Sequence, residues 1–331
     1  MSAFTEEWMS AHDGVNLYTR RYIPASATGG SGKWGASGAK AAILFVHGFI
    51  EHIARSSSAK YGKTSWAEQQ SDIQTMLGVL REGVAHDMPI FLMGHSMVCT
   101  FLLPCHLAIC HRYLACRDLF ELKGGGLALS FPTRPPKAPF IPKSEVVLGL
   151  SGAGTTWSST TCALNMIFFT GVIATSPLLR QSKPAPAWQV GAGGLVSKLP
   201  FGSSMNVPAE VKAEDLSHDP AVGAAYKADP FVKFIGTTKG VYDMLTGGKE
   251  LADQDVTNWP PDLPQTTCQV CSYPTAEKFV KEAPAKDKKF IPFEGGYHEL
   301  HNEPDGVQEK LSETVVGWIL EHIETTATAK L

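Results

Sequence analysis

The segment Gly94-His95-Ser96-Met97-Val98 limits what this chain can fold into more than any other segment. It follows residues 89–93, an apolar run with the length and composition of a buried strand. A strand followed at once by Gly-x-Ser is typical of a sharp turn that holds a serine hydroxyl above the end of a sheet. A second glycine normally closes this pattern, and Val98 stands in its place. A β-branched residue there strains the turn by roughly 1–3 kcal/mol, so the pattern predicts a nucleophile on a distorted turn.

The composition is typical of a globular protein with a large hydrophobic core. The chain has 331 residues, of which 44% are hydrophobic and 18% charged, so we expect one large domain, with or without a cap. A net charge of −3 argues against nucleic acid as a partner. The acidic start lacks the apolar stretch of a secretory signal, and the seven cysteines suit reduced thiols. We therefore expect an intracellular protein, either cytoplasmic or peripheral on a membrane or lipid droplet.

Hydrophobic patterning predicts strands that alternate with helices, which is typical of an α/β fold. Two short strands should pair antiparallel around Asp13-Gly14, and the later apolar runs suit buried parallel strands. Residues 263–267, directly before Cys268, lack an apolar run, so no strand is expected there. Strands are expected at residues 8–10, 17–22, 41–46, 89–93, 171–177 and 288–293, and helices at 65–82 and 307–323.

Several motifs, weak alone and specific together, identify a family resemblance. They are Asp13-Gly14 with Leu17-Tyr18, residues 45–52 around His47-Gly48, the Gly94–Met97 turn, residues 171–179, and the closing Gly296-Tyr297-His298-Glu299-Leu300-His301-Asn302-Glu303. The chain resembles the monoglyceride lipase branch of the α/β-hydrolases, which is also described as serine-aminopeptidase-like. The resemblance implies a mostly parallel sheet flanked by helices with a cap. It also implies hydrolysis of carboxylic esters, monoacylglycerols foremost, through a serine acyl-enzyme.

The resemblance assigns a role to each matching position. Ser96 would be the nucleophile and His298 the general base, while the backbone N–H groups of Phe49 and Met97 would form the oxyanion hole. A hydroxyl needs an imidazole to take its proton, and the oxyanion needs two fixed donors. No cofactor and no metal are implied. The cysteines and histidines between residues 99 and 116 also lack the paired spacing of a zinc site.

The substrate would be a small lipid ester held by the cap. The cap, residues 184–258, would supply an apolar tunnel for the acyl chain and a possible peripheral contact with a membrane or lipid droplet. Candidate tunnel residues are Leu178, Leu179, Trp188, Leu195, Val196, Leu199 and Phe201, although ordinary core packing explains them equally well.

The chain departs from the family pattern in three places. Residues 98–123 separate the serine turn from the glycines and helix that should follow it. A strand and loop are missing after Arg55. The catalytic aspartate is missing too, and a gapless match places Cys268 at its position, with Glu294 and Asp287 as nearby carboxylates that do not match. We therefore expect an incomplete fold and low esterase activity, because loss of the triad acid lowers turnover by up to about 10⁴-fold.

Two segments look foreign to the fold, and codon degeneracy suggests an origin for them. Val98-Cys99 can be encoded by GTNTGY, an intron start, and residues 168–171 by a pyrimidine tract that ends as introns end. We interpret both segments as retained introns, accompanied by lost exon pieces. The expected division is 1–97 and 124–139 as the N-terminal part of the hydrolase core, 98–123 and 140–170 as insertions, 171–183 as a core strand, 184–258 as the cap, and 259–331 as the C-terminal part of the core.

Two other functions stay open. The chain could be a catalytically impaired or inactive splice or gene-model variant, which the missing aspartate and the broken turn favour. It could also be a serine aminopeptidase-like peptidase, which would need a paired acidic site for an α-amino group. The sequence shows no such pair.

Overall fold

The structure is a computed structural model, and it describes residues 4–10, 16–23, 34, 39–48, 66–96, 170–181, 184–250, 252–253, 265–269 and 273–328. Several predictions lie outside these residues. They concern the turn at residues 13–14, the oxyanion donors Phe49 and Met97, and, apart from Thr170, the expected insertions at 98–123 and 140–170.

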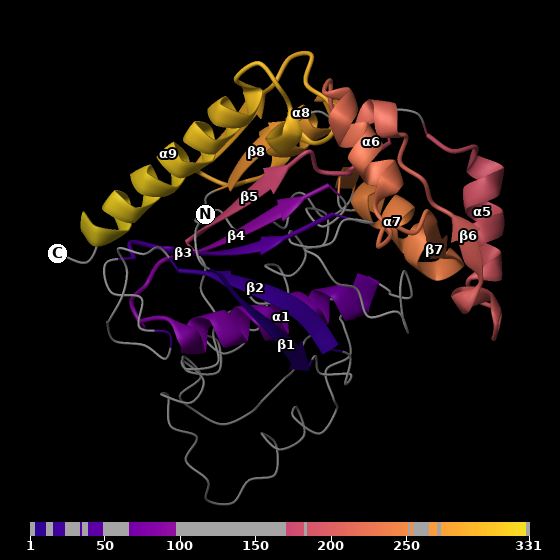
Figure 1. The fold of residues 1–331 in the computed structure, drawn as a ribbon, viewed down its shortest axis with the longest axis horizontal. Helices are drawn as coiled ribbons and strands as arrows, with labels where there is room; N and C mark the ends of the chain where they lie inside the picture. The colour runs from indigo at the N-terminus through magenta and orange to yellow at the C-terminus, as the bar shows by residue number, and fades with distance from the viewer. Residues whose placement is uncertain are drawn as a thin grey trace, which may run out of the picture.

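A five-stranded parallel sheet forms the centre of the molecule, in the order β3-β4-β5-β8-β9 (Figure 1). β4 and β5 lie in the middle and are almost wholly buried, as their continuous apolar sequences require. The predicted parallel α/β sheet is confirmed. Its strands are β3 (Ala42–Val46), β4 (Ile90–His95), β5 (Gly171–Thr175), β8 (Gln265–Gln269) and β9 (Lys288–Pro292).

β8 corrects the expectation that no strand precedes Cys268. It lies between β5 and β9, and Cys268 pairs with Thr175 on one side and Ile291 on the other. The sequence Gln-Thr-Thr-Cys-Gln has no apolar run, so hydrophobic patterning gives no signal for it. Two flanking strands can still satisfy its backbone N–H and C=O groups, and this tertiary pairing outweighs weak local propensity.

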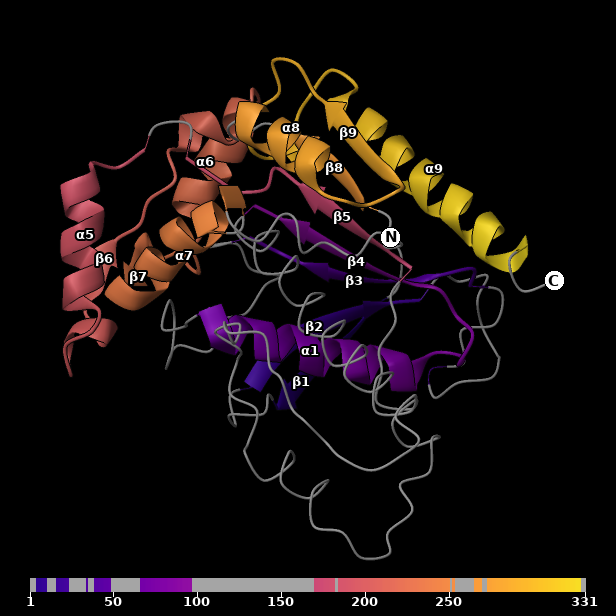
Figure 2. The same ribbon diagram turned by 180° about the vertical axis from the view of Figure 1, so that it is seen from behind.

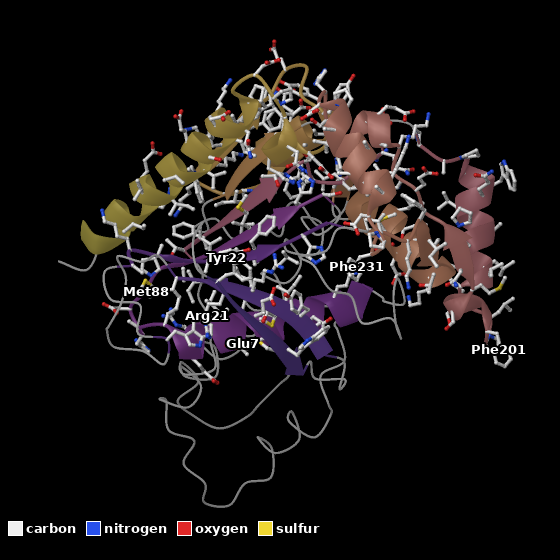
Figure 3. The ribbon with its side chains drawn as sticks, in the orientation of Figure 1. Glu7, Arg21, Tyr22, Met88, Phe201 and Phe231 are labelled. Atoms are coloured by element: carbon white, nitrogen blue, oxygen red, sulfur yellow. The ribbon has the colours of Figure 1, made fainter. Side chains whose placement is uncertain are left out.

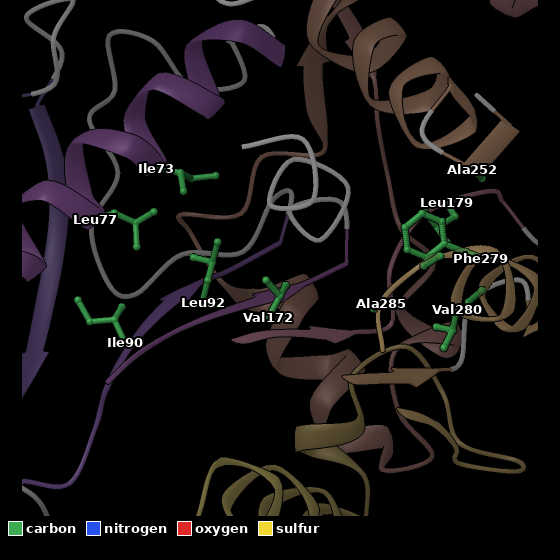
Figure 4. Packing of buried hydrophobic residues seen from close by; sticks show 12 residues of the cluster. Ile73, Leu77, Ile90, Leu92, Val172, Leu179, Ala252, Phe279, Val280 and Ala285 are labelled. Carbon is green, nitrogen blue, oxygen red and sulfur yellow. The ribbon is translucent and has the colours of Figure 1, made fainter. Parts of the chain in front are cut away.

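Helices cover both faces of the sheet (Figures 1 and 2). On one face α1 (Trp66–Gly83) and α8 (Tyr273–Glu282) enclose a core in which Ile73 and Leu77 meet Leu92 and Val172 (Figure 4). On the other face lies α9 (Val307–Thr328), whose Trp318 contacts Phe91 edge to face, with ring centroids 5.8 Å apart. The Trp318 ring also fills the space that a side chain at residue 171 would need, so only glycine fits there.

The N-terminal hairpin of β1 (Phe4–Ser10) and β2 (Asn16–Tyr22) is a two-stranded sheet of its own. Its antiparallel pairing agrees with the prediction, and Arg21 and Glu7 form a 2.7 Å ion pair across it (Figure 3). In the described part of the chain β4 is the one strand hydrogen-bonded to β3, and Ile43 and Phe45 of β3 are exposed. This is the side of the sheet where the family resemblance predicts that a strand and loop are missing.

The cap stands at the carboxyl ends of the strands (Figures 1 and 2). Asp253 links the segment that enters the cap to the helix that ends it. Its carboxylate lies 2.5 Å from Arg180, before the cap, and 2.9 Å from Lys249, in the last turn of α7. No helix in the described ranges is long and apolar enough to cross a membrane. The cap contains α5 (Ala187–Val196), η1 (Gly202–Ser204), β6 (Asn206–Pro208), η2 (Ala213–Asp215), α6 (Pro220–Ala228), β7 (Ile235–Thr237) and α7 (Thr238–Glu250).

Candidate active site

Ser96 occupies a strained turn directly after β4. Its φ of 58° lies in the left-handed region, which costs a non-glycine residue energy and is common at functional turns. The turn is held on both sides, because the Ser96 N–H donates to the Thr175 carbonyl at 2.9 Å and the Ser96 carbonyl accepts from the Leu178 N–H at 3.2 Å. The ends of β4 and β5 therefore support the turn together.

His298 reaches the same point from the loop after β9. Its Nε2 lies 2.8 Å from the Ser96 Oγ, although the two residues are 202 positions apart. At this distance the serine hydroxyl can donate to a neutral imidazole. The backbone of His298 is anchored as well, because its carbonyl accepts from the Ser176 hydroxyl at 2.9 Å and its N–H donates to the Asp215 carbonyl at 3.1 Å. The structure thus brings together the two side chains that the sequence singles out.

Burial keeps the histidines around the serine neutral. Burial, together with the positive charge of a protonated His301, lowers the pKa of His298 to about 4. Burial also lowers the pKa of His301 and holds the pKa of His95 well below its ordinary value. The rings of His298 and His301 lie 5.0 and 5.1 Å from that of His95. At neutral pH His298 is therefore able to accept a proton.

The tautomer of His95 follows from its neighbours. Its Nδ1 lies 3.0 Å from the Thr175 Oγ1, and the Thr175 hydroxyl itself donates to the Gly94 carbonyl. With its proton used there, the hydroxyl accepts from His95, which places the proton of a neutral His95 on Nδ1. His95 thus braces the ends of β4 and β5 against each other.

The family description "Serine aminopeptidase, S33" matches residues 141–305, about half of the chain. A Schizosaccharomyces pombe protein named "Putative monoglyceride lipase" is 26% identical over 329 residues, which cover 88% of this chain and 70% of that protein. A Mycolicibacterium smegmatis "Monoacylglycerol lipase" is 26% identical over 159 residues, which cover 47% of this chain and 55% of the relative.

Solved structures agree on the fold. The crystal structure of a Paleococcus ferrophilus monoacylglycerol lipase superposes with a TM-score of 0.59 at 17% identity, covering 85% of this chain and 94% of that one. A soluble variant of monoglyceride lipase from Saccharomyces cerevisiae gives 0.56 at 16% identity, covering 86% and 88%. The chain has the α/β-hydrolase fold and is similar in sequence to monoglyceride lipases. It differs from the pattern of these lipases at the positions described next.

The other predicted site residues of this hydrolase are not brought to His298 by the described contacts. Phe49 and Met97 lie outside the described residues, and for Cys268 the structure describes the backbone in β8. Asp287 instead contacts α9, with its carboxylate 2.9 Å from the Nε2 of His322, and Glu294 is exposed. Neither of these two carboxylates is therefore placed to pair with the His298 ring.

The sequence analysis did not single out Glu303, which lies in the loop after β9 and contacts the cap. The residue is 4% exposed, and its carboxylate accepts from the Tyr297 N–H at 2.6 Å. It also accepts from the backbone N–H of His218 at 3.3 Å and from its Nδ1 at 2.9 Å. The closing motif already contained Glu303, but no local pattern indicates a partner in the cap.

The seven residues expected to line a tunnel fall into three groups. Leu179 is buried and belongs to the core between the sheet and α1, and Leu178 packs against that core. Val196 is half-buried. Four others are exposed, which makes the tunnel expectation wrong for them: Trp188 (72%), Leu195 (69%), Leu199 (53%) and Phe201 (87%). α5 has no charged residue, so its sequence does not show which side faces outward.

Proposed function

We propose that this chain hydrolyses carboxylic esters of lipids, monoacylglycerols foremost, with Ser96 as nucleophile and His298 as general base. The 2.8 Å separation of the Ser96 Oγ and the His298 Nε2 carries the proposal. Support also comes from the family match and from the names of the two relatives, both of which are monoacylglycerol or monoglyceride lipases.

The reaction proceeds in two halves. His298 Nε2 takes the Ser96 proton while the Oγ attacks the ester carbonyl carbon, and the backbone N–H groups of Phe49 and Met97 donate to the resulting oxyanion. The intermediate collapses, the C–O bond to the glycerol breaks, and the imidazolium protonates the leaving oxygen. A water then repeats the sequence on the acyl-enzyme, with His298 again as base, and releases the fatty acid.

We expect the environment of His298 to lower the rate of this reaction. A base whose pKa is about 4 is neutral at pH 7, but it holds the serine proton weakly. Its imidazolium form arises during each half-reaction, and an ionised carboxylate beside the ring would stabilise that form. With Cys268 at the position of the family aspartate, we expect turnover well below that of a complete triad.

We also propose that the part of the cap formed by α5 and the residues up to Phe201 contacts the lipid surface that holds the substrate. Trp188 and Phe201 are 72% and 87% exposed, and Phe201 lies at the outer end of the cap, away from the sheet (Figure 3). α5 itself carries no charge, so inserting it among lipid headgroups removes apolar surface from water without desolvating an ion.

A fluorophosphonate probe and a substrate panel test the proposed activity. We expect slow labelling of the protein and slow hydrolysis of p-nitrophenyl butyrate and monoolein. Both should be lost in Ser96→Ala and kept in Ser204→Ala, which changes an exposed serine of the cap. Labelling that persists in Ser96→Ala would refute the assignment of the nucleophile, and no labelling at all would favour the inactive variant. Preference for aminoacyl over acylglycerol substrates would favour a peptidase.

A further inference from the structure

The loop that carries His298 is docked on the cap along its length. The N–H groups of His298 and Glu299 donate to the carbonyls of Asp215 and Leu216, at 3.1 and 2.8 Å. The Ser217 hydroxyl donates to the Asn302 carbonyl at 2.8 Å. Residues 215–217 of the cap and residues 298–302 of the loop are thus joined by three hydrogen bonds to main-chain atoms.

Glu303 adds a side-chain contact between the same loop and the same cap segment. One carboxylate oxygen accepts from the N–H of Tyr297, the residue before His298, and the other accepts from the N–H and the Nδ1 of His218. The Tyr297 and His218 rings also lie against each other, with centroids 3.8 Å apart. A single buried carboxylate therefore fixes the backbone before His298 and the end of the docked cap segment together.

The chemistry of this contact suits a precise positioning role. Hydrogen bonds from N–H groups to a carboxylate are short and strong, and the 2.6 Å bond to Tyr297 lies at the short end of their range. Truncating Glu303 would leave the N–H groups of Tyr297 and His218 without this acceptor. The peptide unit that precedes His298 would then move, and the imidazole would move with it.

We propose that Glu303 is a positioning residue for His298, and that through His218 it makes docking of cap residues 215–218 a condition for correct placement of the base. The activity part of this inference rests on the proposed function of Ser96 and His298. Misplacing a catalytic group by about 1 Å can lower a rate by about 10²-fold. The cap would therefore affect kcat as well as substrate binding.

The first experiment compares steady-state kinetics on p-nitrophenyl butyrate for Glu303→Gln and for Glu313→Gln, an exposed carboxylate on α9. We expect Glu303→Gln to lower kcat by about 10- to 100-fold and to change KM by less than about threefold, while Glu313→Gln changes neither. Unchanged kcat in a folded Glu303→Gln protein, or an effect confined to KM, would overturn the proposal.

A second pair of variants keeps the test independent of how well Glu303→Gln folds. The His218 side chain is 48% exposed, so its replacement is tolerated more easily. An asparagine amide can stand near the position of Nδ1 and donate to the same carboxylate oxygen, whereas alanine cannot. We expect His218→Asn to keep most of the kcat and His218→Ala to lose part of it. Equal kcat in the two variants would count against the coupling.

Hydrogen exchange separates this proposal from the proposed function. In the full chain, Glu303→Gln should raise amide exchange in residues 297–302 and in residues 213–218 together, whereas Glu313→Gln should raise neither. If the wild-type chain has no Ser96-dependent activity, the proposed function fails while the exchange result still decides the docking. Faster exchange in one of the two segments alone would refute the shared contact.

Discussion

Phe91 and Phe45 occupy neighbouring strands on the same side of the sheet, yet their surroundings are opposite. Phe91 of β4 is fully buried against Trp318, whereas Phe45 of β3 is 51% exposed. Both lie on the α9 side, because Ala41 packs into the Phe91 cluster and alternate residues of a strand share a face. The sheet is covered where it carries Ser96 and His298, and exposed at β3, the strand after which we predict that a strand and loop are missing.

This contrast divides the candidate site. The serine and histidine come from the covered part, where β4, β5 and β9 end. Phe49, the first proposed oxyanion donor, comes directly after residue 48, where the described residues end. The described contacts therefore account for the positions of the nucleophile and the base, while the oxyanion hole stays a prediction.

The largest expected effect concerns catalysis in the covered part. Cys268 pairs with Thr175 and Ile291 at the position that the family resemblance assigns to the aspartate. If the missing carboxylate limits the rate, Cys268→Asp should raise kcat by about tenfold or more, since the third member of a triad contributes up to about 10⁴-fold. Ester hydrolysis measures this, with Cys271→Asp as the neighbouring control. No gain in a folded Cys268→Asp protein would mean that the open side of the site limits turnover.

The next effect tests the contrast itself through stability. Phe91→Ala should lower the free energy of unfolding by about 3–5 kcal/mol, because it leaves a cavity beside Trp318. Phe45→Ala removes an exposed ring and should cost less than about 1 kcal/mol. Urea unfolding of both variants gives the two values. Similar losses would show that β3 is covered in solution and that the contrast is false.

The histidines of the covered part should make stability depend on pH. His298 has an ordinary pKa of 6.5 and a folded pKa of about 4, so the unfolded chain binds the proton first as the pH falls. The free energy of unfolding should therefore be constant above about pH 7 and fall between pH 6.5 and 4, by roughly 3 kcal/mol from this group.

Urea unfolding at several pH values measures this slope. His298→Gln should reduce it, whereas His86→Gln, which changes an exposed histidine, should not. A stability that rises toward pH 4 in the wild-type chain would contradict the assignment of His298 as a buried, neutral group.

The smallest expected effect comes from deleting the segments that look foreign. Excision of residues 98–123 and 140–170 rejoins Met97 to Gly124 and restores Gly-x-Ser-x-Gly. We expect more cooperative melting, a Tm higher by a few degrees and a better yield, with hydrolysis still slow because the strand after Arg55 is not replaced. Unchanged yield and cooperativity would refute the idea that these segments are foreign to the fold.

Local signals account for what the sequence predicted and for what it did not. The apolar runs of β3, β4 and β5 and the spacing of α1 and α9 are visible in the sequence, because burial in a sheet or on a helix face leaves a period. β8 was missed because its polar sequence is stabilised by pairing with β5 and β9. In the cap, α5 has no charged residue, so its sequence could not separate an outward face from a tunnel lining.

The site shows the same limit. Ser96 and His298 could be named because each follows a strand in a short motif. The contact between His218 and Glu303 joins residues 85 positions apart, and its two partners belong to different layers of the molecule. Such a contact leaves no period and no motif in a single sequence, so a three-dimensional structure was needed to find it.

Gly171 limits how the chain can be joined again after residues 140–170 are excised. It is the first residue after residues 140–170, which we predict to be foreign to the fold, and the Trp318 ring occupies the space where a β-carbon would be. A cloning scar, a tag remnant or a shifted splice junction that puts any other residue at this seam would force the aromatic ring off the sheet. Residues before Gly171 can therefore be changed at such a junction, but every engineered junction should keep Gly171 itself.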